Sequence, residues 1–390
     1  MSTLTKKSKK LELSEDFLAS FSVIPDKRKC YQKLHPLKNI ILITICAILC
    51  GADSWLAVEK IGKCKIKWFR KFLWMPHGIP SHDTFARVFI WLDPKVIQSF
   101  LAKWGKEICD LVDGETIAID GKVQRRSFDK ASGQSAICMV SAFACNSGIT
   151  LGLTKVASKT NEIKAIPELL DTVAVKNCTV TIDAIGCQKN IANKVREKGA
   201  DYVLAVKKNQ SKLYSQIKTL LQKLRRMNRL TRPLKNLCVK EKGHGRKEVR
   251  NYWITDQIDS IKDKALWKDL KSVGCVESTR IIDGKKSVET RYFITSHKAD
   301  ENIFAKSIRD HWKIENGCHW TLDVIFRADD NRMRVGHSAE NFVALQYFSL
   351  NLLKMETTAK TSVRIKRHMC ANDEKYLQKV LSVYRKKSHA

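Results

Sequence analysis

The N-terminal part of the chain has the spacing of apolar residues that is typical of amphipathic helices. A polar, lysine-rich segment at residues 1–13 precedes it, and we predict that this segment is disordered. Between Pro and Gly residues, the apolar spacing predicts helices over residues 37–51, 55–62 and 65–73. Another helix should begin at Ser81 or Asp83, because either side chain can accept free backbone amides just before the apolar series that starts at Phe85. Residues 14–113 are therefore expected to form an all-helical N-terminal domain.

After residue 114 the pattern changes to strands and helices in alternation. β-branched and apolar runs predict strands, and stretches with helical spacing follow several of them. In chain order we predict strands at 116–120, 136–145 and 149–157, a helix at 161–173, a strand at 180–183, a helix at 189–198, a strand at 201–206 and a helix at 211–224. The turn at residues 146–148 should join the second and third strands as a hairpin. This order predicts a mixed sheet with helices on both faces.

Strand signals return between about residues 233 and 296. Four runs carry them, at 236–239, 247–254, 272–282 and 288–295. Helical spacing resumes at Ala299 and continues past Glu315, so the β-rich stretch should be an insertion between the sheet and its last helix. The region from about residue 330 is helical and basic. We expect one α/β domain over residues 114–390 that contains this insertion.

The charge of the chain favours a polyanionic partner. Lys and Arg number 71 against 40 Asp and Glu, which leaves a formal charge of +31. Such an excess suits nucleic acid, whose neutralised phosphates release counterions, better than the alternatives of solubility alone or of binding to a membrane surface. The longest apolar run, residues 40–50, is too short to span a bilayer, no secretory signal is visible, and the 13 cysteines form no CxxC pair. We therefore expect a soluble, reduced, intracellular protein with no membrane partner.

Two aspartates stand where buried strands should end. Asp120 follows the apolar run at residues 116–119, and Asp183 ends the run at 180–183, each before a small residue. The carboxyl ends of strands are where α/β folds place ligand and metal sites. With Glu315 from the later helix, these carboxylates would hold two Mg²⁺ ions roughly 4 Å apart, which clamp the attacking and leaving oxygens of a phosphodiester. The alternative is that Asp183 caps the following helix and that Glu315 lies on a helix surface.

Several short sequence motifs occur together along the chain, and their combination is specific. Residues 118–122 read AIDGK, residues 181–189 read TIDAIGCQK, residues 199–210 read GADYVLAVKKNQ, and residues 311–316 read HWKIEN. Residues 24–28, 51–55 and 78–84, which read IPDKR, GADSW and GIPSHDT, belong to the same set. In this combination and order, from about residue 14 to residue 380, the chain resembles the DDE transposases of bacterial insertion sequences, and in particular the H-repeat-associated proteins.

The resemblance implies a fold, a site and a reaction. Asp120, Asp183 and Glu315 would be the catalytic and metal-binding triad on a ribonuclease-H-like sheet, holding two Mg²⁺ ions for which Mn²⁺ can substitute. The implied activity is metal-dependent DNA cleavage at the ends of an element and strand transfer into target DNA. The implied partners are terminal inverted repeats, target DNA and further copies of the chain, as a homodimer or higher oligomer in a synaptic complex. Such a protein acts in the cytoplasm at the nucleoid, and its helical N-terminal domain would recognise the element ends.

Other residues are candidates for contacts with DNA. Lys122, Arg125, Arg126, Lys207, Asn209 and Gln210 follow the ends of strands and would position phosphates, although Asn209 has the alternative role of a helix cap. His311 and His319 stand four residues before and after Glu315 on one helical face. We expect His311 to contact phosphate, and leave His319 open between such a role, tuning of the metal site and ordinary packing. Trp312 and Trp320 would stack on bases, with core packing expected for at least one of them.

The chain also departs from the pattern of the family. Ile308, His311 and Leu322 occupy places where the broader class carries Tyr, Arg and Lys, and the histidine is expected to be a trait of the H-repeat group. Cys138 stands where we expect His, and Ala328 where we expect Glu. These two departures favour one alternative, a catalytically silent DNA-binding protein from a decayed element. A second alternative from the same fold is a ribonuclease-H-like nuclease, against which the large helical N-terminal domain argues.

Overall fold

The structure is a computed structural model that describes residues 15–22, 24–29, 33–108, 112–128, 133, 135–156, 162–231, 234–243 and 245–384. The segment predicted to be disordered, residues 1–13, lies outside these residues. The chain forms two compact units. The helical unit takes in the chain up to residue 97, residues 125–134 and the chain from residue 321, and the sheet unit takes in residues 98–124 and 135–320.

The helical unit contains helices from both ends of the chain. The N-terminal helices are α1 (Glu15–Ser22), α2 (Leu37–Leu49), α3 (Trp55–Cys64), α4 (Ile66–Phe69), α5 (His82–Trp91) and the start of α6 (Pro94–Glu107). The C-terminal helices are α11 (Trp320–Val324, on the boundary between the units), α12 (Ser338–Met355), α13 (Val363–Asn372) and α14 (Glu374–Ser382). Of the two residues predicted to start α5, Ser81 is the cap, because its hydroxyl accepts a hydrogen bond from the Thr84 amide at 3.3 Å.

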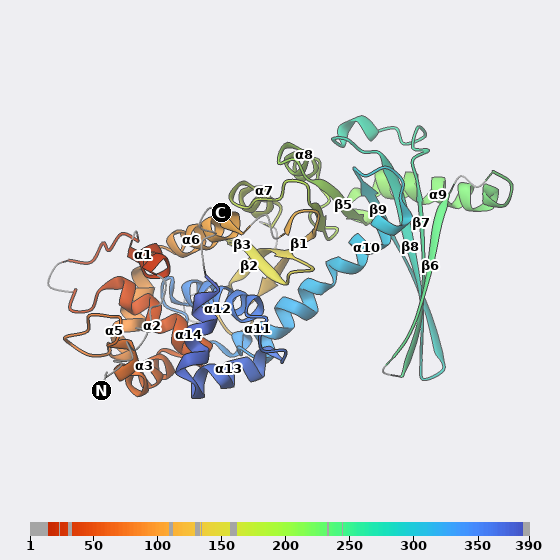
Figure 1. Cartoon of the computed structure of the whole chain (residues 1–390). Helices are drawn as coiled ribbons and strands as arrows, with labels where there is room; N and C mark the ends of the chain where they lie inside the picture. Colours follow the sequence, from red (N-terminus) through yellow and green to blue (C-terminus); the bar gives the residue numbers. More distant parts are fainter. Residues whose placement is uncertain are drawn as a thin grey trace, which may run out of the picture. The chain divides into compact units, whose positions relative to one another are not determined.

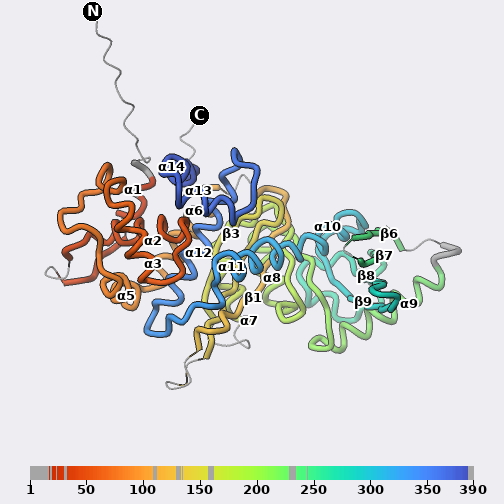
Figure 2. The backbone as a smooth tube through the Cα atoms, turned by 90° about the horizontal axis from the view of Figure 1, so that it is seen from below, coloured from red at the N-terminus to blue at the C-terminus, as the bar shows by residue number. Residues whose placement is uncertain are grey.

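Helix α12 lies in the middle of the helical unit and is buried on almost every side. It packs against α2 and α5, and Figure 2 shows it next to the N-terminal helices. The Trp55 indole donates to the Ser338 hydroxyl at 3.0 Å and packs edge-on against Phe342. The Asn341 amide donates to the carbonyls of Phe89 and Leu92. The N-terminal helices therefore share one core with the C-terminal helices, whereas the sequence-based boundaries had assigned these two groups to different domains.

The sheet unit contains one mixed sheet of nine strands in the order β3-β2-β1-β4-β5-β9-β8-β7-β6. The strands are β1 (Thr116–Val123), β2 (Cys138–Ala144), β3 (Ile149–Val156), β4 (Thr179–Ile182), β5 (Asp201–Val206), β6 (Lys235–Gly243), β7 (Arg246–Thr255), β8 (Ser272–Ile282) and β9 (Lys285–Thr295). Strands β1, β4 and β5 are parallel neighbours, and every other pairing is antiparallel. This arrangement confirms the predicted fold class, a ribonuclease-H-like mixed α/β sheet with a helical N-terminal region. The β-rich insertion extends the same sheet, because β9 pairs with β5.

Helices cover both faces of the sheet (Figure 1). They are α7 (Glu162–Thr172), α8 (Lys189–Glu197), α9 (Ser211–Thr231) and α10 (Glu301–His311), with short 3-10 turns at Lys208–Gln210 and Lys264–Leu266. On β9, Tyr292 packs against Tyr214 of α9, while the adjacent Phe293 packs against Phe304 of α10. Because successive side chains of a strand point to opposite faces, α9 and α10 cover opposite faces of the sheet. None of the helices in the described part of the chain combines the length and the apolar character needed to cross a bilayer.

Candidate active site

Asp120 and Asp183 stand at the point where the parallel pairing of β1 with β4 ends. Asp120 lies within β1, which continues to Val123 against β2, and Asp183 directly follows the last residue of β4. In the register of β1 and β4, Ile119 pairs with Ile182, so the next residue on each chain is an aspartate. Strand register therefore sets the relative positions of the two aspartates, but the predicted end of the first strand at residue 120 is wrong, because β1 continues through Gly121 to Val123. The Asp120 carboxylate accepts the amide of Gly121 at 2.9 Å. Gly121 itself faces α7, where a Cβ would lie 2.8 Å from Glu162, so Asp120 points to the opposite face, which α10 covers.

Glu315 reaches this edge from a distortion in the helix that follows α10. After α10 ends at His311, the chain forms a π-helical turn over Glu315–His319 and then enters α11. Such turns hold one residue more than an α-turn and occur frequently at functional sites. The turn places Glu315 and His319 side by side, with His319 Nδ1 3.5 Å from Glu315 Oε2 and 3.7 Å from Asp120 Oδ2. One ligand atom from each of Asp120, Glu315 and His319 lies within 4.8 Å of the others.

Asp183 stands apart from this group. Its Oδ1 accepts the amides of Ile185 at 3.0 Å and Gly186 at 3.4 Å, so its side chain is bound by its own turn. It does not cap the following helix, because the N-cap of α8 is Gln188, and that alternative reading is wrong. The structure thus brings two of the three predicted carboxylates together with His319, whose role the sequence left open. The spacing of four residues from Glu315 was the signal in the sequence that pointed to His319.

Burial and the neighbouring carboxylates make the ionised form of Asp120 costly. Burial raises the pKa of Asp120 to about 7 against the opposing effect of His319, and the charges of Glu315 and Asp183 add to the rise. The hydrogen bonds of Glu315 with His319 and Asp120, and the charge of Lys122, lower the pKa of Glu315 although partial burial opposes this. Two carboxylates and an imidazole converging on one point make a donor set that fits a divalent cation.

His311 lies beside Asp183. Its Nδ1 is 3.0 Å from the Thr181 hydroxyl, and burial lowers its pKa although Asp183 and Glu315 act in the opposite direction. The neighbouring Trp312 is 43% exposed, and the guanidinium of Arg291 lies 5.3 Å from the centre of its ring. Trp320 is 54% exposed. The expectation that one of these two tryptophans packs in the core is wrong, because both present a large part of their surface to solvent.

The candidate phosphate contacts after β1 divide between the two units. Lys122 is buried in the sheet unit and acts electrostatically on Glu315. Arg125 and Arg126 belong to the helical unit, where they pair with Asp329 at 3.4 Å and Asp330 at 3.1 Å. Their side chains are exposed, but their charges are partly neutralised by these aspartates. A role of these three residues in DNA binding stays a prediction.

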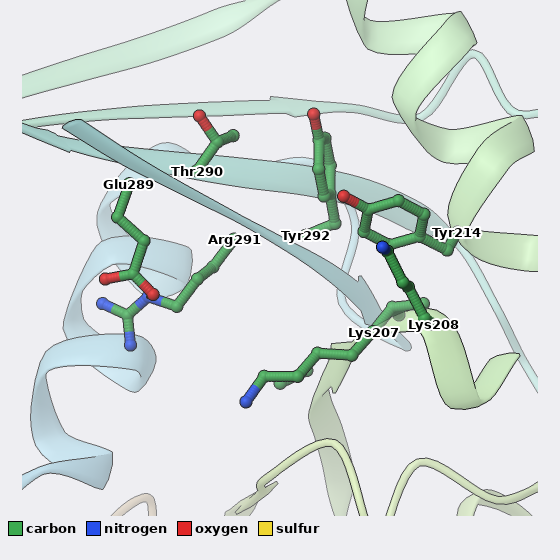
Figure 3. Close-up of a pocket in the computed structure, with 9 residues that line it drawn as sticks. Lys207, Lys208, Tyr214, Glu289, Thr290, Arg291 and Tyr292 are labelled. Carbon is green, nitrogen blue, oxygen red and sulfur yellow. The ribbon is translucent and has the colours of Figure 1, made fainter. Parts of the chain in front are cut away.

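The candidates at the end of β5 have two different placements. The Asn209 amide donates to the Ala184 carbonyl at 2.6 Å, and the Gln210 amide donates to the Cys187 carbonyl at 3.0 Å, so both side chains hold the loop after Asp183. Lys207 instead lines a pocket of about 320 Å³ between β5, β9 and α9. Figure 3 shows this pocket, with Lys207 from the end of β5 and Arg291 from β9 in its wall. Direct DNA contact by Lys207, Asn209 or Gln210 also stays a prediction.

The two departures from the family pattern occupy buried positions. Cys138 opens β2, and its thiol lies 3.5 Å from Glu162 of α7. Ala328 begins a 3-10 turn, Ala328–Asp330, in the helical unit. Neither residue belongs to the group formed by Asp120, Glu315 and His319.

Comparison with known proteins gives consistent matches along the chain. The family described as "DDE_Tnp_1-associated" matches residues 18–105, and the family described as "Transposase DDE domain" matches residues 104–352. A protein of Escherichia coli O157:H7 named "Putative transposase YncI" is 39% identical over 94% of this chain and 95% of its own. The "H repeat-associated putative transposase YhhI" of Escherichia coli K12 is 37% identical over 93% of this chain and 96% of its own.

One solved structure also matches at low similarity. It is a chain of the piggyBac transposase synaptic complex with hairpin DNA, at 11% identity and a TM-score of 0.38, covering 98% of this chain and 81% of that one.

Proposed function

The chain belongs to the DDE transposase family in its H-repeat-associated branch, and on that premise we propose that Asp120, Asp183 and Glu315 catalyse DNA cleavage at element ends and strand transfer into target DNA. One observation carries the proposal: residues from β1 and from the helix after α10, far apart in the sequence, converge to form the Asp120–Glu315–His319 group. Asp183 supports it more weakly: it follows Ile182, the register partner of Ile119, and so stands at the position equivalent to Asp120.

The residues present support a divalent cation as cofactor. Two Mg²⁺ ions, or Mn²⁺ in their place, would be held by Asp120, Asp183 and Glu315, and would polarise the phosphodiester and activate the attacking oxygen when bound. The raised pKa of Asp120, about 7, means that this residue would have to give up its proton more readily once it held a cation. His319 adds a nitrogen at the same point and keeps Glu315 oriented toward Asp120.

The partners follow from the same premise. The substrate is duplex DNA, both the terminal inverted repeats and the target, and the helical unit is proposed to recognise the repeats. Its N-terminal part corresponds to the domain predicted over residues 14–113. Synapsis of two ends calls for a homodimer or higher oligomer, and a chromosomal substrate places the protein at the nucleoid in the cytoplasm.

The test is a cleavage and joining assay on duplexes that carry the ends of the element, with Mg²⁺, Mn²⁺ or EDTA. Asp120→Ala, Asp183→Ala and Glu315→Ala should each lower cleavage and joining at least about a hundredfold, because each removes an oxygen ligand. Glu301→Ala, which removes a carboxylate from the first turn of α10, is the matched control and should leave activity unchanged.

Two outcomes would replace the proposal by its alternatives. Cleavage without joining at any DNA concentration would make the chain a nuclease. Binding to DNA without cleavage in either metal would make it a silent DNA-binding protein. The family departures at Cys138 and Ala328 are the sequence features that favour this alternative.

A further inference from the structure

The far ends of β6, β7, β8 and β9 form a ribbon that reaches beyond α9 and α10 (Figure 1). Residues paired across neighbouring strands point to the same face of a sheet. The register therefore defines two adjacent rows on one face: Lys242, Lys247, Ile281 and Lys286, then Lys240, Val249, Thr279 and Val288. We call the face formed by these eight residues the lysine face. It carries four lysines and no acidic residue.

The opposite face of the same ribbon is balanced in charge. The Glu248 carboxylate, 2% exposed, contacts Arg250 at 2.6 Å and Arg280 at 2.9 Å. Glu241 contacts Arg250 at 2.8 Å and Arg309 of α10 at 3.3 Å. Glutamates and arginines on that face thus satisfy one another, and the two faces differ sharply in net charge.

Nothing in the described part of the chain neutralises the lysine face. Helix α9 covers only the near half of this side, where Arg225 lies over Trp253 at 3.9 Å and pairs with Glu277 at 3.3 Å. Beyond that point, Lys240, Lys242, Lys247 and Lys286 are exposed and have no ion-pair partner among the described residues. Two apolar side chains between them are open to solvent as well, Ile281 at 37% and Val288 at 55%.

We propose that the lysine face binds the sugar-phosphate backbone of duplex DNA, an inference that rests on the proposed function. Cations without nearby carboxylates suit a polyanion, and the exposed Ile281 and Val288 can contact deoxyribose. Four strands span about 14 Å, wider than the roughly 12 Å major groove, so the ribbon lies against the backbone and reads no base edges. A second copy of the chain is a poorer occupant, because both partners would carry a net charge of +31.

The test measures how the affinity for a nonspecific duplex depends on salt. The variant replaces Lys240, Lys242, Lys247 and Lys286 by Gln, and a matched control replaces four other exposed lysines of the sheet unit, Lys262, Lys268, Lys271 and Lys298, in the same way. Each lost phosphate contact lowers the log–log slope by about 0.9, so the variant should lose up to about 3.6 and the control should keep the wild-type slope. Thermal unfolding followed by circular dichroism checks that both variants fold.

Labelling of the unmodified protein gives a second readout. Lysine acetylation followed by mass spectrometry should show protection of the four lysines by duplex DNA, while the four control lysines stay reactive. A wild-type slope in the variant, or reactive lysines in the complex, would overturn this inference and leave the proposed function standing if joining activity persists. A variant that keeps the slope but loses self-association in sedimentation would assign the face to a second copy. Wild-type protein that binds no duplex would overturn both proposals.

Discussion

Asp120 is a carboxylate that is both largely buried and close to other carboxylates. Its side chain is 22% exposed and lies next to Glu315, with Asp183 at the following register position. Burial and these neighbours make its ionised form costly, which is why its pKa is raised to about 7. The unfolded chain has no such cost. The site therefore lowers the stability of the metal-free protein.

The variant Asp120→Asn should be more stable than the wild type without metal. Because the folded protein holds a proton on Asp120 that the unfolded chain releases near pH 4, wild-type stability falls as pH rises from about 4 to about 7. Asn cannot ionise and its oxygen can still accept the Gly121 amide. Urea unfolding in EDTA should show a gain on the order of 2–4 kcal/mol at pH 8 and little gain at pH 4. Glu301→Gln is the control, and an equal gain at both pH values would contradict the explanation.

Individual residues of the site were predictable where local signals exist. An aspartate after a β-branched run is such a signal, and the register of β1 and β4 puts Asp120 and Asp183 at equivalent positions, although β1 continues three residues beyond Asp120. The π-helical turn at Glu315–His319 has no comparable signal, so the contact of His319 with Asp120 could not be foreseen. The loop-holding bonds of Asn209 and Gln210 depend on the path of the chain after Asp183, which periodicity does not encode.

Helix α10 leads into the turn that carries Glu315. The position of α10 depends on a glycine in the sheet. The Phe304 ring packs directly on Gly274 of β8, where a Cβ would lie 2.6 Å from the ring and 2.6 Å from the Trp253 carbonyl. Around it, Tyr252, Phe293 and Ile308 complete a buried cluster. The close approach of helix and sheet thus requires the absence of a side chain at residue 274.

Gly274→Ala should push α10 away from the sheet and weaken the site from a distance. Overpacking of this kind typically costs about 1–3 kcal/mol, and the shift of α10 should reduce divalent-cation binding as well. Gly243→Ala is a matched control on β6, because a Cβ there would meet nothing within 4 Å. Chemical unfolding and calorimetric titration with Mn²⁺ measure the two effects. Equal behaviour of the two variants would show that the contact with Phe304 does not set the position of α10.

The elements themselves were largely predictable, but their assembly was not. Strand and helix periodicities predicted β1 to β9 and α7 to α10 close to their observed positions. The pairing of β9 with β5 makes the insertion part of the same sheet as β1 and β4. It joins segments about 90 residues apart, so no local sequence pattern indicates it. The exposure of Trp312 and Trp320 was missed for a related reason, since apolar spacing on a helix does not reveal whether a neighbour covers it.

At the scale of the molecule, helices from the N-terminal and C-terminal regions share one core. Besides Trp55 and Phe342, the Arg367 guanidinium donates to the Ile48 carbonyl at 2.8 Å, and the Lys65 ammonium donates to the Ala371 carbonyl at 2.9 Å. Sequence patterns show that each helix has an apolar face but not which helix covers it, so the predicted boundaries simply followed chain order.

Phe342→Ala should therefore loosen helices at the other end of the chain. Phe342 is fully buried against Trp55, and its truncation leaves a cavity that typically costs 3–5 kcal/mol. Hydrogen exchange measured by mass spectrometry should accelerate in α3 and α5, while amides of β1, β4 and β5 keep their protection. Ile365→Ala removes an exposed side chain from α13 and serves as the control. Unchanged exchange in α3 and α5 would mean that the N-terminal helices do not depend on α12.

This shared core also fixes the order of events while the protein is being made. Roughly 220 residues separate the two chain segments that build most of the helical unit. A ribosome adds roughly 5–20 residues per second, so the first helices wait on the order of 10–40 s before α12 emerges to cover them. During that interval their apolar faces are open to chaperones and to other nascent chains. The yield of folded protein should therefore depend on translation speed and on chaperone supply. This dependence should be stronger than for a protein that consisted of the sheet unit alone.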